Sequence, residues 1–219
     1  MVSLTREQIA SVAGIALAAT FSFFPFAGLF ERLGNRFALS NHVLSMILML
    51  TITGFLALVA FGIQKRPLTF FGIRRIGWRD LGAMFLAIFY TVSVILLAKL
   101  LVEHFSTPEP GETGEAEHIP LALGLTMAAV AGITEEFIYR GFVIEELGEL
   151  VGNRWLAGAF SVLAFGLSHH VNGYGWSIEL LYPTLAGLVI TVLYLWRRNL
   201  LVCTLMHFGV DALQYWRAS

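Results

Sequence analysis

Long apolar runs without charged side chains are the feature that most constrains how this chain folds. A membrane hydrocarbon core of about 30 Å is crossed by roughly 20 helical residues, and most of the chain lies in runs of about that length. Only 13% of its 219 residues are charged, against about 25% in an average soluble domain. The runs predict seven transmembrane helices: Ile9–Phe30, Asn41–Ile63, Gly82–Val102, Leu121–Leu150, Trp155–His170, Ile178–Trp196 and Leu200–Tyr215.

The predicted fold is therefore all-α, a polytopic transmembrane helical bundle that forms a single domain over residues 1–219. Transmembrane β-strands are about 10 residues long and alternate in polarity, and these runs do neither. The fourth run is long enough to break near Gly132 or Gly141, so eight spans are an alternative to seven.

The uneven distribution of Lys and Arg predicts how the bundle is oriented. Cytoplasmic connections carry the excess of these residues. If the N-terminus is cytoplasmic, nine Lys and Arg residues outside the spans fall on the cytoplasmic side: Arg6, Lys65, Arg66, Arg74, Arg75, Arg79, Arg154, Arg197 and Arg198. Only Arg32, Arg36 and Arg217 fall on the other side. We therefore expect a protein of the cell's inner (plasma) membrane, in contact with membrane lipids and with its N-terminus in the cytoplasm.

Net charge and cysteine content argue against two classes of protein. The formal net charge of −1 gives no basic excess, so we expect no nucleic-acid partner. The single cysteine, Cys203, cannot form an intramolecular disulfide.

Three ionisable residues fall in the middle of the fourth predicted span: Glu135, Glu136 and Arg140. Burying such a group costs about 2.5–3.5 kcal/mol on insertion scales, so each is a functional hypothesis. Glu136 and Arg140 are four residues apart, the spacing at which an acid and a base meet on one helix face. Glu135 lies about 100° further around the helix and must face another partner. A buried carboxylate of this kind is suited to take a proton from water and return it to a leaving group.

The fifth predicted span ends with Ser168, His169 and His170. Adjacent residues on a helix do not face one another, so we expect Ser168 to point away from His169. We assign neither Ser168 nor His170 to the chemical set.

In the seventh predicted span, Cys203, His207 and Asp211 recur every four residues on one face. The Asp211 carboxylate can bond the His207 imidazole and fix its tautomer, as such pairs do in hydrolases. Cys203 beside His207 also admits a thiol nucleophile. We disfavour that mechanism because it leaves Glu135 and Glu136 without a task.

These residues together resemble a known family. The Glu-Glu-x-x-x-Arg of Glu135, Glu136 and Arg140 is followed by the Phe-x-x-x-His of Phe165 and His169, and then by the His-x-x-x-Asp of His207 and Asp211. Their order and spacing resemble the CAAX protease and bacteriocin-processing family, which includes the Ras-converting CAAX endopeptidases. The similarity covers roughly residues 125–215, and the motif-bearing part of the chain is about 121–216.

The resemblance implies a multi-span α-helical peptidase. In it, Glu135 and His169 would activate a water, and His207 and Asp211 would help to stabilise an oxyanion or orient the water. Glu136, Arg140 and Phe165 would support that site. Better-known CAAX endopeptidases tend to have Asn where this chain has Asp211. An ionised Asp cannot donate a hydrogen bond to an oxyanion, so either Asp211 is protonated or it holds His207.

Metal dependence is a separate question. Two histidines and a glutamate are a plausible zinc set with an open fourth position, so Glu135, His169 and His207 could bind Zn²⁺. The sequence lacks the His-Glu-x-x-His motif of the zincins, and we favour the mechanism without a metal or other cofactor.

We expect an intramembrane endopeptidase that cuts a peptide or protein substrate near the membrane surface. The cleaved bond would lie close to the substrate's C-terminus, next to a hydrophobic or lipid-modified segment. Two alternatives remain open: a non-catalytic membrane protein for bacteriocin immunity or partner binding, and a transporter in which the buried acids relay protons. The absence of an internal repeat argues against the transporter.

Overall fold

The computed structural model describes residues 5–23, 27–37, 40–105, 119–171 and 180–218, and among these it contains helices and their connections but no strand. The all-α prediction is therefore confirmed for this part of the chain. The helices are α1 (Arg6–Phe23), α2 (Ala27–Phe37), α3 (Asn41–Ala57), η1 (Leu58–Ile63), η2 (Leu68–Phe71), α4 (Trp78–Phe105), α5 (Leu121–Glu135), η3 (Glu136–Val143), α6 (Ile144–Val151), α7 (Arg154–His169), α8 (Leu181–Arg197) and α9 (Leu200–Ala218).

Three of the described helices are long and apolar enough to cross a membrane: Asn41–Ile63, Trp78–Leu100 and Leu121–Val151. A shorter apolar helix covers Leu181–Arg197. The count of seven spans is thus not confirmed. The predicted start of the sixth span, Ile178, lies outside the described residues.

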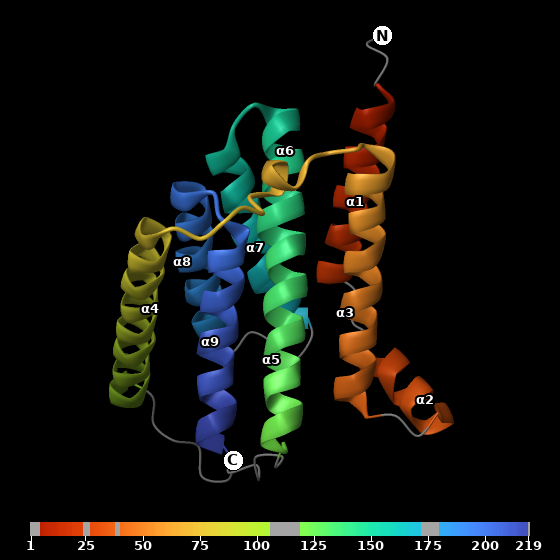
Figure 1. Cartoon of the computed structure of the whole chain (residues 1–219). Helices are drawn as coiled ribbons and strands as arrows, with labels where there is room; N and C mark the ends of the chain where they lie inside the picture. The colour runs from red at the N-terminus through yellow and green to blue at the C-terminus, as the bar shows by residue number, and fades with distance from the viewer. Residues whose placement is uncertain (1–4, 24–26, 38–39, 106–118, 172–179, 219) are drawn as a thin grey trace.

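The first predicted span, Ile9–Phe30, contains two described helices, and residues 24–26 between them lie outside the described residues. Helix α1 ends at Phe23 and a separate helix, α2, begins at Ala27. Helix α2 carries charged residues among its apolar ones, as expected of a helix at a membrane surface, and lies across the end of α3 (Figure 1).

The fourth predicted span is continuous, so the alternative of a break near Gly132 or Gly141 is wrong. Residues 121–151 form one helical rod, in which η3 is a π-helical segment between α5 and α6. A π turn lets the chain keep its backbone hydrogen bonds while it changes the direction of its side chains. Eight spans are therefore not supported.

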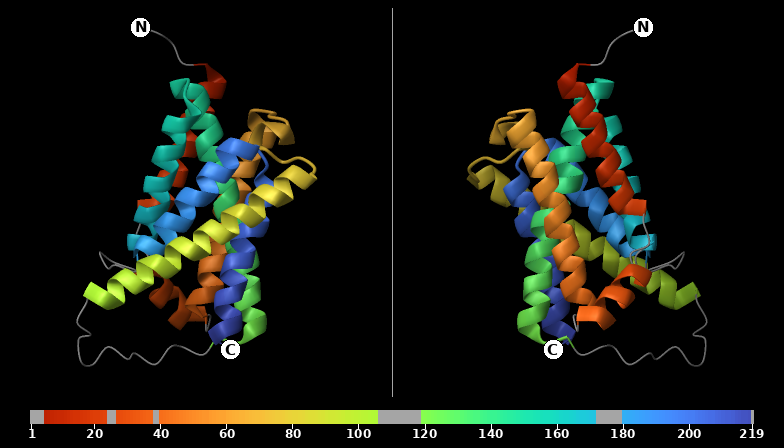
Figure 2. Two further views of the ribbon diagram at one scale, coloured as in Figure 1. Left: turned by 90° about the vertical axis from the view of Figure 1, so that its left-hand side faces the viewer. Right: turned by 90° about the vertical axis from the view of Figure 1, so that its right-hand side faces the viewer.

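The helices form one bundle in which α5 pairs with α9 and α7 pairs with α8 (Figure 1). Helix α4 crosses α8 and α9 obliquely, as the left view of Figure 2 shows. The joined ends of α7 and α8 lie at about mid-height of the bundle, whereas α5 and α9 continue beyond them (Figure 2). Residues at the end of α7 therefore lie at the level of the middle of α5 and α9.

A buried carboxylate ties the connection before α4 to the turn between α8 and α9. Asp80, only 2% exposed, accepts hydrogen bonds from Arg74 Nη2 at 3.0 Å, Arg197 Nε at 3.0 Å and Asn199 Nδ2 at 3.1 Å. Because Asp80 bonds both Arg74 and two residues of the α8–α9 turn, it helps to fix where α9 begins.

Glycines set the close approach of α5 to α9. A Cβ added to Gly132 would lie 3.2 Å from both the Thr204 carbonyl oxygen and the Phe208 amide nitrogen. These are backbone atoms of α9, which cannot rotate away. Small residues at such positions let membrane helices pack backbone to backbone.

We predict that Gly132→Leu destabilises the protein although leucine favours helix more than glycine does. The added side chain must push α9 away, and overpacking of this kind costs about 1–3 kcal/mol. Thermal unfolding of the detergent-solubilised chain should show a lower melting temperature. Gly209→Leu is the matched control, because nothing lies within 4 Å of a Cβ at that position of α9. Equal melting temperatures for the two variants would contradict this packing.

Candidate active site

The π-helical segment η3 lies at the centre of the candidate site. All eight of its residues, Glu136 to Val143, are buried. The Ile144 amide donates to the Tyr139 carbonyl, five residues back, which is the bond that defines a π turn. Such segments occur frequently at functional sites, and here the segment begins at the second of the two motif glutamates.

Glu136 is a fully buried carboxylate with two charged or chargeable partners. Its Oε1 accepts from Arg140 Nη1 at 3.0 Å and lies 2.7 Å from His207 Nδ1. Glu136 and Arg140 both have no exposed side-chain surface. The expected pairing of these two residues on one helix face is confirmed, and the pair also reaches α9.

Arg140 connects η3 to α8 with its remaining donors. Its Nη2 donates to the Gly187 carbonyl at 2.8 Å and its Nε to Thr191 Oγ1 at 3.3 Å. The guanidinium carbon also lies 4.6 Å from the centre of the Phe165 ring, within the range of a cation–π contact. A Cβ at Gly187 would come within 2.7 Å of that ring, so glycine is needed where α8 passes.

Gly187 and Thr191 were not among the site residues predicted from the sequence. Thr191 offered a weak signal, because it is a hydroxyl residue in an otherwise apolar stretch of α8. Gly187 offered none beyond its size, since it acts through its backbone carbonyl.

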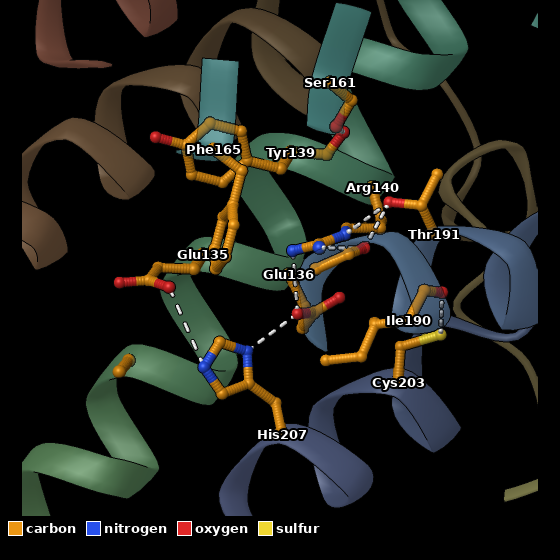
Figure 3. Close-up of polar contacts among 12 residues, drawn as sticks. Glu135, Glu136, Tyr139, Arg140, Ser161, Phe165, Ile190, Thr191, Cys203 and His207 are labelled. Carbon is orange, nitrogen blue, oxygen red and sulfur yellow. Dashed lines mark hydrogen bonds and ion pairs between the residues drawn. The ribbon is translucent and has the colours of Figure 1, made fainter. Parts of the chain in front are cut away.

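His207 faces acids through both ring nitrogens (Figure 3). While Nδ1 bonds Glu136, its Nε2 lies 3.7 Å from Glu135 Oε2 and 3.4 Å from Asp211 Oδ2. Glu135 thus faces His207 instead of the arginine, as expected from its position around the helix. Glu135 and Asp211 keep 16% and 28% of their side-chain surface exposed. These two acids are therefore the members of the cluster that a substrate can reach.

His169 is oriented by its own helix. Its Nδ1 lies 2.9 Å from the Phe165 carbonyl oxygen, which can only accept, so Nδ1 carries the proton. In the neutral ring, Nε2 then holds the lone pair and can accept a proton. The His169 ring lies 4.5 Å from the Phe165 ring, which in turn lies 6.3 Å from the His207 ring. Phe165 therefore lies among Arg140 and both histidines.

The expectation that Ser168 points away from His169 is wrong. Ser168 Oγ lies 3.5 Å from His169 Nδ1, because both side chains turn back to the Phe165 carbonyl; Ser168 donates to it at 2.7 Å. Cys203 is fully buried, and its Sγ contacts the Ile190 carbonyl at 3.9 Å. Both hydroxyl and thiol are directed at backbone oxygens.

Among the described residues, no group of three His, Cys, Asp or Glu side chains has the arrangement needed to hold a metal ion. This statement includes Glu135, His169 and His207, the three residues considered for zinc.

Comparison with known proteins gives one match. Residues 117–213 match the family model described as Type II CAAX prenyl endopeptidase Rce1-like, which confirms the resemblance drawn from the motifs. A search of the curated proteins found no match, and neither did a search of the solved structures. The matched region contains every residue of the cluster, from Glu135 to Asp211. Together with the apolar helices, the match supports an integral membrane protein whose residues 117–213 are similar to this protease family.

We predict that Arg140→Met lowers the free energy of unfolding by about 3–5 kcal/mol, because it leaves the buried Glu136 carboxylate without its cation. Chemical denaturation in detergent measures the effect. Adding Glu136→Gln to Arg140→Met should recover part of the loss, since no buried charge then remains unpaired. Arg79→Met is the control, because Arg79 is exposed. A loss no larger than that of the control would contradict the role of the pair.

Proposed function

We propose that this protein is an intramembrane endopeptidase in which Glu135 and His169 activate a water. The observation that carries the proposal is the arrangement around His207, where Glu135, Glu136 and Asp211 all lie within 4 Å of the imidazole. Glu135 is partly exposed and has no arginine partner among the described contacts, so its carboxylate is available to a water. The family match at residues 117–213 supports hydrolysis of a peptide bond.

In the proposed reaction, Glu135 takes a proton from the water while the His169 Nε2 lone pair accepts a hydrogen bond from it. The water oxygen attacks the carbonyl carbon of the substrate and forms a tetrahedral oxyanion. The C–N bond then breaks, and Glu135 returns the proton to the leaving amine. Such positioned acid–base catalysis contributes about 10²–10⁴-fold to the rate.

His207 is the proposed donor to the oxyanion. Glu136 at Nδ1 fixes the ring, and a protonated Nε2 would donate to developing negative charge, which is the usual origin of oxyanion stabilisation. Asp211 lies against the same nitrogen at 3.4 Å. We assign Asp211 the task of holding His207, because an ionised carboxylate cannot donate to an oxyanion.

The proposed substrate is a membrane-associated peptide or protein with a hydrophobic or lipid-modified C-terminal segment. The family description names CAAX prenyl endopeptidases, which supports a prenylated cysteine near the cleaved bond. The apolar helices of the bundle support a substrate segment of this kind.

Glu135→Gln and His169→Ala should each reduce cleavage by about 10²–10⁴-fold in proteoliposomes that hold a reporter peptide with a C-terminal prenylated cysteine and three further residues. Release of the terminal peptide is followed by mass spectrometry. Glu7→Gln is the control, because Glu7 is an exposed acid of α1. If either site variant folds and cleaves like the control, the assignment fails. A non-catalytic immunity protein would show no cleavage in any form.

Cleavage should persist when 1,10-phenanthroline is added, since we assign proton transfer to Glu135 and not to a metal-bound water. The zinc alternative makes the opposite prediction. Activity that is lost with the chelator and restored by Zn²⁺ would place the metal on Glu135, His169 and His207.

A further inference from the structure

A polar pocket lies where the turn between α6 and α7 meets the end of α8. Its volume is about 550 Å³, and its walls include Arg154, Arg198, Phe70 and Trp155. The α6–α7 turn and the end of α8, which supply most of its lining, lie at the end of the bundle opposite the C-terminus (Figure 1), and none of the residues of the candidate active site lines it. It therefore has no part in the proposed peptide hydrolysis.

A second, apolar hollow continues from this pocket along the outside of α7 and α8. Its volume is about 370 Å³, and almost all of its lining surface is apolar; Ala159, Leu163, Leu188 and Val192 contribute to it. Trp155 and Leu195 line both hollows. A ligand with a polar head and an apolar chain could thus occupy the two together.

One buried carboxylate holds the two arginines of the polar pocket in place. Glu145, 1% exposed, accepts from Arg154 Nε at 3.1 Å, from Arg198 Nη2 at 2.7 Å and from the Tyr194 hydroxyl at 2.8 Å. Arg154 and Arg198 share this one carboxylate, so neither guanidinium has an acid of its own among the described contacts. The remaining acid of the pocket, Glu149, is paired with Arg66.

Arg154 is the residue most available to a ligand. Its side chain is 54% exposed, and it uses Nε for Glu145, so both Nη groups remain for an outside acceptor. Its alkyl chain packs on Gly148, where a Cβ would lie 2.9 Å from Arg154 Cγ. A guanidinium held in one place with two donors to spare suits a phosphate.

The depth of the two hollows matches the layers of a membrane. The spans Asn41–Ile63 and Leu121–Val151 end, and Trp78–Leu100 begins, at the end of the bundle that carries the polar pocket. Trp78 and Trp155 are 88% and 64% exposed there, and tryptophan gathers at the level of lipid headgroups. The polar pocket then faces headgroups, and the apolar hollow faces acyl chains.

We propose that these two hollows form a binding site for an anionic phospholipid, with its phosphate on Arg154 and one acyl chain between α7 and α8. An anionic headgroup is favoured because Arg154 and Arg198 share one carboxylate and the Arg154 Nη groups are left for a second anion. This inference does not depend on the proposed function.

Native mass spectrometry of the full chain in detergent tests the proposal, with dioleoylphosphatidylglycerol and dioleoylphosphatidylcholine as probes. Wild-type protein should retain phosphatidylglycerol several-fold more than phosphatidylcholine. Arg154→Gln should remove that preference, whereas Arg79→Gln, at an exposed arginine near the same end, should leave it unchanged. Ala159→Trp should fill the apolar hollow and lower retention of both lipids, unlike Ala13→Trp at an exposed position of α1.

Equal lipid retention by wild-type protein, Arg154→Gln and Ala159→Trp would overturn the proposal. Displacement of phosphatidylglycerol by inorganic phosphate alone would also overturn it, because the site would then bind a free anion and not a lipid. Melting temperatures of the variants identify any that fail to fold. Because Ala159 is exposed and bonds nothing through its side chain, its variant keeps the test decisive if Arg154→Gln unfolds.

Discussion

A charged carboxylate with no exposed surface, Glu136, is the constraint on which the C-terminal half of the structure depends. An isolated charge in an apolar interior is too costly to persist, so every element around it must supply a partner. Arg140 comes from the same π segment and His207 from α9. Since Arg140 also binds α8 through Gly187 and Thr191, the Glu136–Arg140 pair links η3, α8 and α9.

The spacing of residues in the sequence predicted those contacts that depend only on the geometry of a single helix. Residues four apart on a helix must share a face, so the Glu136–Arg140 pair and the closeness of His207 to Asp211 could be predicted without knowing the fold. The partners of Arg140 on α8 could not, because they depend on how far apart two helices pack. The contact between Ser168 and His169 was not predicted for a related reason. Adjacent side chains do approach each other when both turn back to one carbonyl near a helix end.

The predicted spans were confirmed only in part, because three described helices are long and apolar enough to cross a membrane and the count of seven is not confirmed. In the fourth run, the glycines suggested a break where the chain stays helical. A glycine next to another helix serves close packing, as Gly132 does against α9, and only the tertiary structure distinguishes the two uses.

The π segment η3 changes the phase of the rod that contains it. An α-helix advances about 100° per residue, and each π turn takes in one residue more, so side chains beyond η3 are turned relative to a regular helix. One rod therefore has two packing directions: α5 lies against α3 and α9, whereas α6 lies against α1 and α7. If residues 121–151 formed a regular α-helix, the Glu135 and Glu136 motif would be kept, but the Glu145 carboxylate would point in another direction. It would then lose its ion pairs with Arg154 and Arg198.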